Sequence, residues 1–279
     1  MSVRPLPLLR NGLSATRFVN SYQLPGRPGH FQGLLSTQAS QDRVVWPALK
    51  TWSSIGPDGQ ETLEGLKGPA TSDLIVPVEI SQPHVGYNAG GSKWDRIEMP
   101  FSLFLDAFIQ RKIPWSQGSE EQQPVGYLAQ FDLLSKVPAL AEEAPGLPHT
   151  QAGPKGANEQ WRSNVWIGPA GTYTPIHRDP YENMFAQVVG QKRVHLFSPS
   201  LAPYLYINKS GPQKNTSAIR SERELLSASQ DRPLLSAALS SEDAFVAELG
   251  PGDVLYIPQG WYHCVQSLST SASVNFWYL

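Results

Sequence analysis

The sequence has 279 residues, 40% of them hydrophobic and eight of them tryptophan, which is typical of a soluble folded protein with a sizeable core. Its formal net charge of −2 predicts no general attraction to nucleic acid or acidic membranes, and no stretch approaches the roughly 20 apolar residues of a membrane span. The single cysteine, Cys264, excludes an intramolecular disulfide, is expected to be a small buried residue, and favours an intracellular location in cytoplasm or nucleus. Because no acidic residue precedes Asp42, a mitochondrial location is the alternative.

Residues 1–160 have the mixed pattern of an α/β region that flanks a larger unit. Apolar spacing and breaker residues predict five segments in chain order. These are a short helix at Trp46–Trp52, a buried strand at Asp73–Ile80, a helix at Met99–Ile113, a strand and helix within Gly126–Leu140 that ends at Pro138, and a loop at Pro145–Gln160.

Residues 161–279 consist of short β-forming segments bounded by Gly, Pro or Ser. Eight strands are predicted, at Trp161–Gly168, Thr172–Asp179, Asn183–Gly190, Lys192–Ser198, Ala244–Gly250, Asp253–Pro258, Trp261–Leu268 and Ser271–Leu279. The Gly190-Gln191 pair is predicted to form a tight hairpin. A polar stretch, Asn208–Asp243, interrupts the strands and is expected to be an insertion with one or two helical turns at Ser221–Ser229. The predicted fold class is therefore mainly β, a closed sandwich or jelly roll with flanking N-terminal helices and strands.

His177 and Asp179 stand two residues apart in one predicted strand, so their side chains share a face. An imidazole and a carboxylate so placed can bind one divalent metal, and His263, within YIPQGWYHCV, is the candidate third ligand. Two histidines and one carboxylate leave coordination positions open, as in non-haem Fe(II) oxygenases. Zinc sites of the thermolysin type use the same ligand types on an H-E-x-x-H helix, which this sequence lacks. The triplet His-x-Asp alone also occurs in strands that bind no metal.

Lys192 is predicted to share one strand face with Val194 and Leu196. A lysine on an aliphatic face is costly to bury without an anionic partner. A bound dicarboxylate would provide that partner, and Thr174 and Asn183 could donate further hydrogen bonds to it. The alternative is that the lysine extends past its aliphatic neighbours to water.

Four segments carry a resemblance to a known family. They are GYLAQ (126–130), TPIHRDPYENMFAQVVGQKRVHLFSP (174–199), GDVLYIPQGWYH (252–263) and VNFWYL (274–279). The chain resembles the JmjC-type, cupin-like 2-oxoglutarate oxygenases, and within them the protein side-chain hydroxylases. Both the asparaginyl hydroxylase of hypoxia-inducible factor and the arginyl-hydroxylase-type branch are similar. The resemblance is strong over the last 120 residues and weaker before them.

The resemblance implies one JmjC domain over 1–279, with a double-stranded β-helix catalytic core at 161–279. It further implies Fe(II) held by His177, Asp179 and His263, with 2-oxoglutarate and O2 as cosubstrates. The distal carboxylate of 2-oxoglutarate would pair with Lys192. Hydrogen bonds to the cosubstrate are expected from Thr174, Asn183, Tyr127 and Asn275, and contacts with the substrate from Gln130, Trp166 and Trp277.

The expected reaction is hydroxylation of a side chain in a protein or peptide substrate. Methyl-lysine demethylation and hydroxylation of a tRNA nucleoside by the same chemistry are alternatives, as is a non-catalytic cupin-fold binding protein. The near-neutral charge disfavours a nucleic-acid substrate, and no membrane partner is expected. The resemblance to the asparaginyl hydroxylase stops at Leu279, before the helices that make that enzyme a dimer, so a monomer or weak dimer is expected.

Overall fold

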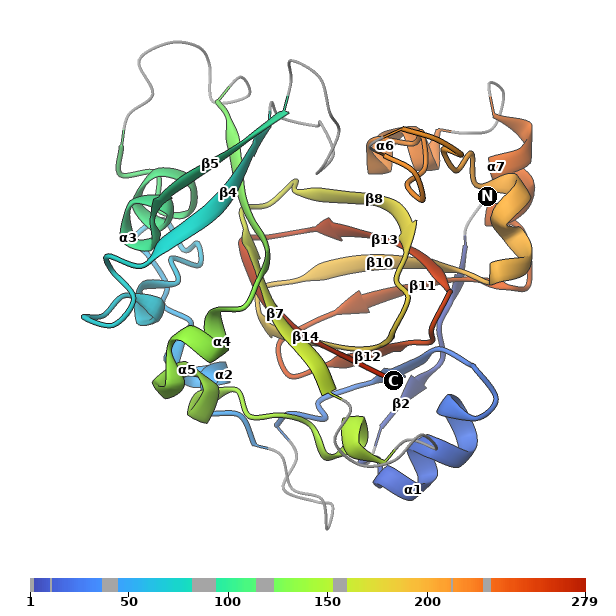
Figure 1. Ribbon diagram of the computed structural model, residues 1–279, viewed down its shortest axis with the longest axis horizontal. Helices are drawn as coiled ribbons and strands as arrows, with labels where there is room; N and C mark the ends of the chain where they lie inside the picture. The colour runs from blue at the N-terminus through green and yellow to red at the C-terminus, as the bar shows by residue number, and fades with distance from the viewer. Residues whose placement is uncertain are drawn as a thin grey trace.

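Two β-sheets form the body of the molecule (Figure 1). The computed structural model describes residues 3–10, 12–36, 45–81, 94–113, 123–152, 160–211, 213–227 and 232–279. In spatial order, the first sheet contains β1 (Arg4–Pro5), β11 (Ala244–Leu249), β10 (Lys192–Phe197), β13 (Tyr262–Ser267) and β8 (Tyr173–Arg178). The second contains β2 (Leu8–Leu9), β3 (Gly29–Phe31), β12 (Val254–Ile257), β9 (Glu182–Val189), β14 (Ser271–Tyr278), β7 (Gln160–Gly168), β6 (Val125–Phe131), β4 (Ile75–Ser81) and β5 (Trp94–Pro100).

The strands from β7 to β14 divide equally between the sheets. Within the described ranges, β8, β10, β11 and β13 lie in the first sheet, and β7, β9, β12 and β14 lie in the second. Two four-stranded antiparallel sheets arranged in this way are the core of a jelly roll. The predicted mainly β jelly-roll fold is therefore confirmed, and each of the eight predicted strands is present.

Helices are short and lie mostly outside the two sheets (Figure 1). The N-terminal ones are α1 (Ala15–Phe18), which continues as η1 (Val19–Gln23), α2 (Ala48–Thr51), η2 (Glu64–Leu66) and α3 (Phe101–Phe104), which continues as η4 (Leu105–Ile109). Then follow α4 (Leu133–Lys136), α5 (Pro138–Glu143), η6 (Pro148–Gln151), η7 (Pro199–Tyr204), α6 (Glu222–Leu226) and α7 (Pro233–Leu239). No helix in the described part of the chain is both long enough and apolar enough to cross a membrane.

The flanking region packs against the second sheet through one hydrophobic core. Trp46 is buried beside Phe276 of β14, with ring centroids 6.0 Å apart. Phe101, Phe104 and Phe108 of α3 and η4 are buried as their helical spacing predicts. Full burial of each such side chain stabilises the fold by roughly 1.5–3 kcal/mol. This packing supports β6, which lies next to β7 and extends the sheet beside the candidate site.

Three local predictions differ from the structure. Pro138 does not end a helix that crosses it: α4 stops at Lys136, and Pro138 begins α5, because proline is tolerated in the first turn. The helix predicted at Met99–Ile113 spans Phe101–Ile109, because the residues up to Pro100 pair with β4 as strand β5. The polar insertion contains a second helix, α7, besides the predicted helical turn at α6.

The connection between β9 and β10 also differs from its prediction as a hairpin. These two strands belong to different sheets, so Gly190 and Gln191 carry the chain from one sheet to the other. Gly190 has a φ of 70°, and a Cβ atom there would lie 2.0 Å from the carbonyl oxygen of Thr270. Glycine is required here by both backbone conformation and lack of space.

Candidate metal centre and adjoining pockets

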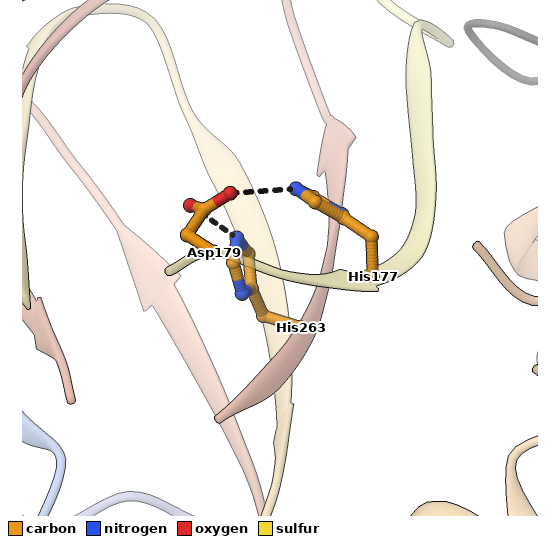
Figure 2. Close-up of side chains that lie close together, drawn as sticks. All are labelled: His177, Asp179 and His263. Carbon is orange, nitrogen blue, oxygen red and sulfur yellow. Dashed lines mark ion pairs between the residues drawn. The ribbon is translucent and has the colours of Figure 1, made fainter. Parts of the chain in front are cut away.

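Three side chains converge at one end of the first sheet (Figure 2). His177 lies near the end of β8, Asp179 follows that strand directly, and His263 lies in the neighbouring strand β13, opposite His177 in the antiparallel register. The Oδ1 of Asp179 is 3.7 Å from the Nε2 of His177, and its Oδ2 is 3.6 Å from the Nε2 of His263. The pairing of β8 with β13 therefore brings the third predicted ligand to the first two.

Backbone hydrogen bonds orient both imidazole rings. The Nδ1 of His177 is 2.9 Å from the carbonyl oxygen of Pro175, and the Nδ1 of His263 is 3.3 Å from that of Trp261. Because a carbonyl oxygen only accepts, the Nδ1 of each ring is the donor in these contacts, and each Nε2 is directed to Asp179 at the centre. Burial, reinforced by the neighbouring His177, lowers the pKa of His263 to about 4, so this ring is neutral near pH 7.

The donor set fits one divalent ion. Three ligand atoms, two imidazole nitrogens and one carboxylate oxygen, lie within 4.8 Å of one another. This combination on one face leaves open positions around an ion, as Fe(II) oxygenase sites require. A tetrahedral structural zinc site would need a fourth protein ligand, and no fourth His, Cys, Asp or Glu joins this group in the described residues.

An inner cavity is lined in part by all three residues. Besides them it is lined by the predicted cosubstrate-binding residues Thr174, Asn183, Tyr127 and Asn275, and by Trp166, Phe185 and Val265. The predicted cosubstrate residues therefore come from four different strands to one cavity. Phe185 and Val265 had not been singled out, although Phe185 follows Asn183 at strand spacing and so shares its face.

Lys192 is fully buried next to two residues that line this cavity. Its Nζ lies 5.9 Å from the ring centroid of Tyr127 and 5.4 Å from that of Phe185, both of which line the cavity. Within the described part of the chain, the Nζ has no hydrogen-bond partner and no ion pair. Burial lowers the pKa of Lys192 to about 7. The prediction that Lys192 lies on an aliphatic face is confirmed, and the alternative in which it extends to water is wrong, because its relative exposure is 0%.

A chain of side-chain amides supports the carboxylate of Asp179. Asn183 donates to its Oδ2 over 3.3 Å, and Asn275 donates to the Oδ1 of Asn183 over 3.1 Å. Asn164 and the indole nitrogen of Trp166 both donate to the Oδ1 of Asn275, over 3.2 Å and 2.9 Å. Asn164 was missed in the sequence, although its position two residues before Trp166 places it on the same strand face.

An outer pocket of about 180 Å³ adjoins two of the three residues, His177 and Asp179. It is lined by His177, Asp179, Thr174 and Pro175, by all three predicted substrate residues, Gln130, Trp166 and Trp277, and by Thr216. Gln130 has a left-handed backbone with a φ of 50°, at an irregularity in the pairing of β6 with β7. A non-glycine residue in that conformation is uncommon and costs of order 1–3 kcal/mol, which is typical of functional sites.

Thr216 belongs to the insertion and was not anticipated. It forms an isolated antiparallel bridge with His177, and the next residue, Ser217, donates its backbone N–H to Ile176 over 2.7 Å. The insertion is thus attached to β8 beside the candidate metal ligands. Neither residue carries a sequence pattern that would have revealed this contact.

Comparison with known proteins places this geometry in a family. The Cupin-like domain family matches residues 15–279. Lysine-specific demethylase 8 of Xenopus tropicalis is 30% identical over 266 residues, which are 95% of this chain and 51% of that protein. Lysine-specific demethylase JMJ30 of Arabidopsis thaliana is 32% identical over 270 residues, 96% of this chain and 54% of that protein. Jumonji C domain-containing protein 5 of Drosophila melanogaster is 30% identical over 233 residues, which are 84% of this chain and 52% of that protein.

The chain spans about half the length of the curated relatives it matches. The family match covers the flanking helices, the flanking strands β3 to β6 and all eight strands of the jelly roll. The two histidines and the aspartate that meet at the end of the first sheet are the donor types that this fold uses for a metal. The chain belongs to the cupin-like JmjC family, whose members are in general Fe(II)- and 2-oxoglutarate-dependent oxygenases.

Proposed function

We propose that this chain is an Fe(II)- and 2-oxoglutarate-dependent oxygenase that hydroxylates a side chain of a protein substrate and releases succinate and CO2. The observation that carries the proposal is the fully buried Lys192, whose Nζ has no hydrogen-bond partner among the described residues. This Nζ lies 5.9 Å and 5.4 Å from the rings of Tyr127 and Phe185, which line the inner cavity together with the three candidate metal ligands. A buried cation without a partner is costly. A cosubstrate with one carboxylate at the metal and another at the lysine would remove that cost.

His177, Asp179 and His263 would hold the iron through two Nε2 atoms and a carboxylate oxygen. When bound, the iron and 2-oxoglutarate supply the oxidation chemistry, in which O2 gives one oxygen atom to the substrate C–H bond and the other to succinate. Lys192 would pair with the carboxylate of 2-oxoglutarate that lies away from the metal. A hydrogen bond to a charged group contributes roughly 1.5–3 kcal/mol.

The remaining residues of the inner cavity would orient the cosubstrate and exclude water. Thr174 and the Tyr127 hydroxyl can donate hydrogen bonds, and both side chains are buried. Asn183 and Asn275 can serve a cosubstrate only with the bonding capacity that is left after their contacts with Asp179 and with each other. These two asparagines therefore would act partly by holding the carboxylate of Asp179 in place.

The outer pocket would receive the side chain that is oxidised. Gln130 brings an amide that can both donate and accept, and Trp166 and Trp277 bring apolar surface. A protein substrate is supported by the relatives named lysine-specific demethylases, since lysine is a protein side chain. The formal net charge of −2 gives no support for a polynucleotide substrate.

Demethylation of methyl-lysine is the second candidate, and the names of those relatives favour it. The same chain residues would act, but the oxidised carbon would be an N-methyl group, which then leaves as formaldehyde. The two outcomes differ in their products. Hydroxylation adds 16 Da to the substrate peptide, whereas demethylation removes 14 Da and releases formaldehyde.

The test is to incubate the purified protein with Fe(II), 2-oxoglutarate and a fractionated cell extract, and to measure succinate and peptide masses. Extract-stimulated succinate release together with a +16 Da peptide is the expected result. The His177→Ala variant, tested in parallel, should give neither. If formaldehyde forms without a +16 Da product, the reaction is demethylation and not hydroxylation. If succinate does not exceed the background of the His177→Ala variant, the oxygenase proposal is refuted.

A further inference from the structure

An open groove of about 550 Å³ lies beside the candidate metal centre. We call it the basic groove, and its walls comprise Arg178, Asp179 and Pro180 after β8, Ile207, Asn208, Lys209, Lys214 and Asn215 of the insertion, and Gln259, Gly260 and Tyr262 before and at the start of β13. Its volume is within the range of about 300–1,000 Å³ that is usual for ligand sites. Its three cations, Arg178, Lys209 and Lys214, line neither the outer pocket nor the inner cavity.

The cations of the groove have no carboxylate partners. Arg178, Lys209 and Lys214 are exposed, and none forms an ion pair with a described residue. By contrast, Arg193 pairs with two carboxylates on the outer face of the first sheet. The one acid in the groove wall, Asp179, has its two oxygens directed to the two histidines. The groove therefore presents a net positive charge although the whole chain has a formal charge of −2.

Hydrogen bonds from both walls hold the groove in shape. Asn215 donates its side-chain amide to the carbonyl of Arg178 over 2.8 Å, which attaches the insertion to the end of β8. On the opposite wall, Gln259 donates its side-chain amide to the carbonyl of Pro180 over 2.6 Å, and its backbone N–H donates to the carboxylate of Glu182 over 2.9 Å. A groove that is formed before binding avoids part of the entropy cost of ordering loops around a ligand.

The groove is continuous with the site of the proposed reaction. Asp179 lines the basic groove, the inner cavity and the outer pocket. Asn215 lines the groove while the next residue, Thr216, lines the outer pocket. An extended segment in the groove would thus lie beside any side chain that enters the outer pocket.

We propose that the basic groove binds an acidic segment of the protein substrate, next to the residue that enters the outer pocket. The position of the oxidised residue in the outer pocket rests on the proposed function. The acidic character of the neighbouring segment rests on the charge and shape of the groove. Carboxylates would pair with Arg178, Lys209 and Lys214. The side-chain amides of Asn208 and Gln259 already donate to the carbonyls of Thr216 and Pro180, so the peptide backbone would use their remaining N–H and carbonyl capacity.

A peptide fits the groove better than a nucleic acid. Single-stranded nucleic acid is usually bound by basic grooves that also offer aromatic faces for stacking of bases. Tyr262 is the one aromatic residue of the groove wall, it is 5% exposed, and the guanidinium of Arg178 lies over its ring at 5.7 Å. The groove therefore offers charges and amides without a stacking surface.

The test is equilibrium binding of labelled probes to the Mn²⁺-loaded full chain, measured by fluorescence anisotropy at low salt. The probes are three peptides of equal length, with three Glu, three Gln or three Lys in the same Gly/Ser sequence, and an oligouridylate. The Glu peptide should bind best. The Lys209→Gln/Lys214→Gln double variant should bind it about 5- to 30-fold more weakly, since each exposed ion pair contributes up to about 1 kcal/mol.

A matched control removes two exposed cations elsewhere, in the Arg17→Gln/Lys50→Gln variant of α1 and α2, and should bind the Glu peptide like the unchanged chain. Equal affinity for Glu and Gln peptides, or an unchanged Kd in the double variant, would overturn the proposal. Tighter binding of oligouridylate that is lost in the double variant would assign the groove to nucleic acid instead. Since binding needs no turnover, a missing succinate signal with an intact Glu preference would refute the oxygenase function and leave the charge preference of the groove standing.

Discussion

The side-chain amide of Asn183 donates a hydrogen bond of 3.3 Å to the Oδ2 of Asp179, the same oxygen that lies 3.6 Å from the Nε2 of His263. Asn183 lies in the second sheet and Asp179 directly after a strand of the first, so this contact links the two sheets at the candidate metal centre. Asn275 in turn holds Asn183. The orientation of the carboxylate is therefore determined by residues of both sheets.

The Asn183→Ala substitution should lower metal affinity about 10- to 100-fold, because partners that orient a ligand from behind have effects of that size. The measurement is titration of the metal-free protein with Mn²⁺ by calorimetry. Gln187→Ala is the matched control, since this buried amide lies on the same strand but bonds to Val189, Gly190 and Ser273, outside the chain that supports Asp179. Equal metal affinity in the Asn183 variant and the unchanged protein would show that the contact does not support the carboxylate.

Replacement of His177, Asp179 or His263 by Ala should each abolish 2-oxoglutarate turnover, because two remaining ligands hold Fe(II) weakly and in the wrong geometry. Succinate release by the three purified variants is the assay. Asp73→Ala, at an exposed aspartate that lines neither cavity nor groove, should keep full turnover. Normal turnover in any one of the three variants would remove that residue from the proposed ligand set.

The Lys192→Ala substitution should weaken 2-oxoglutarate binding about 10- to 150-fold and leave metal affinity largely unchanged. This range corresponds to the roughly 1.5–3 kcal/mol of a hydrogen bond to a charged group. Calorimetry with the Mn²⁺-loaded protein measures both constants, and Lys50→Ala, at an exposed lysine, serves as the control. The proposed role fails if the cosubstrate binds the Lys192 variant as tightly as the unchanged protein.

Because Lys192 titrates, 2-oxoglutarate affinity should fall with rising pH while the stability of the ligand-free protein rises. Burial lowers the pKa of Lys192 from 10.5 to about 7, so between these values the unfolded chain binds more protons than the folded, ligand-free chain. The free energy of unfolding of the ligand-free protein therefore rises with pH in this window. A carboxylate pairs with the protonated lysine, so 2-oxoglutarate affinity should fall as pH rises above about 7. The measurement is the Kd for 2-oxoglutarate from pH 6.5 to 8.5. The Lys192→Met variant should not show this fall in affinity.

Two variants separate the amide of Gln130 from its backbone strain. Gln130→Gly should raise the free energy of unfolding by about 1 kcal/mol, because glycine adopts a positive φ without a Cβ penalty. It should also lower kcat/KM for the protein substrate about 2- to 12-fold, the effect of losing one hydrogen bond. Gln130→Asn keeps an amide and tolerates the left-handed conformation, so its kcat/KM should fall less than that of the glycine variant. An unchanged kcat/KM in the glycine variant would exclude Gln130 from substrate contact.

Local patterns in the sequence were sufficient for the strands and for part of the site. Alternation along a strand placed His177 and Asp179 on one face, and it placed Lys192 with Val194 and Leu196 on another. Both arrangements are present, because side-chain alternation depends only on the extended backbone. The same reasoning was weaker at element ends, where Pro138 begins a helix instead of ending one.

What the sequence by itself determined was thus the set of strands, the two ligands His177 and Asp179 at the end of β8, and the lysine on β10. Only the tertiary structure decided that His263 faces His177 across β8 and β13, that Asn164 supports the amide chain, and that the insertion supplies Thr216 and the cations of the basic groove. These contacts join segments far apart in the chain. Their pairing is selected by burial of the whole core and by closure of the two sheets, and no local pattern encodes it.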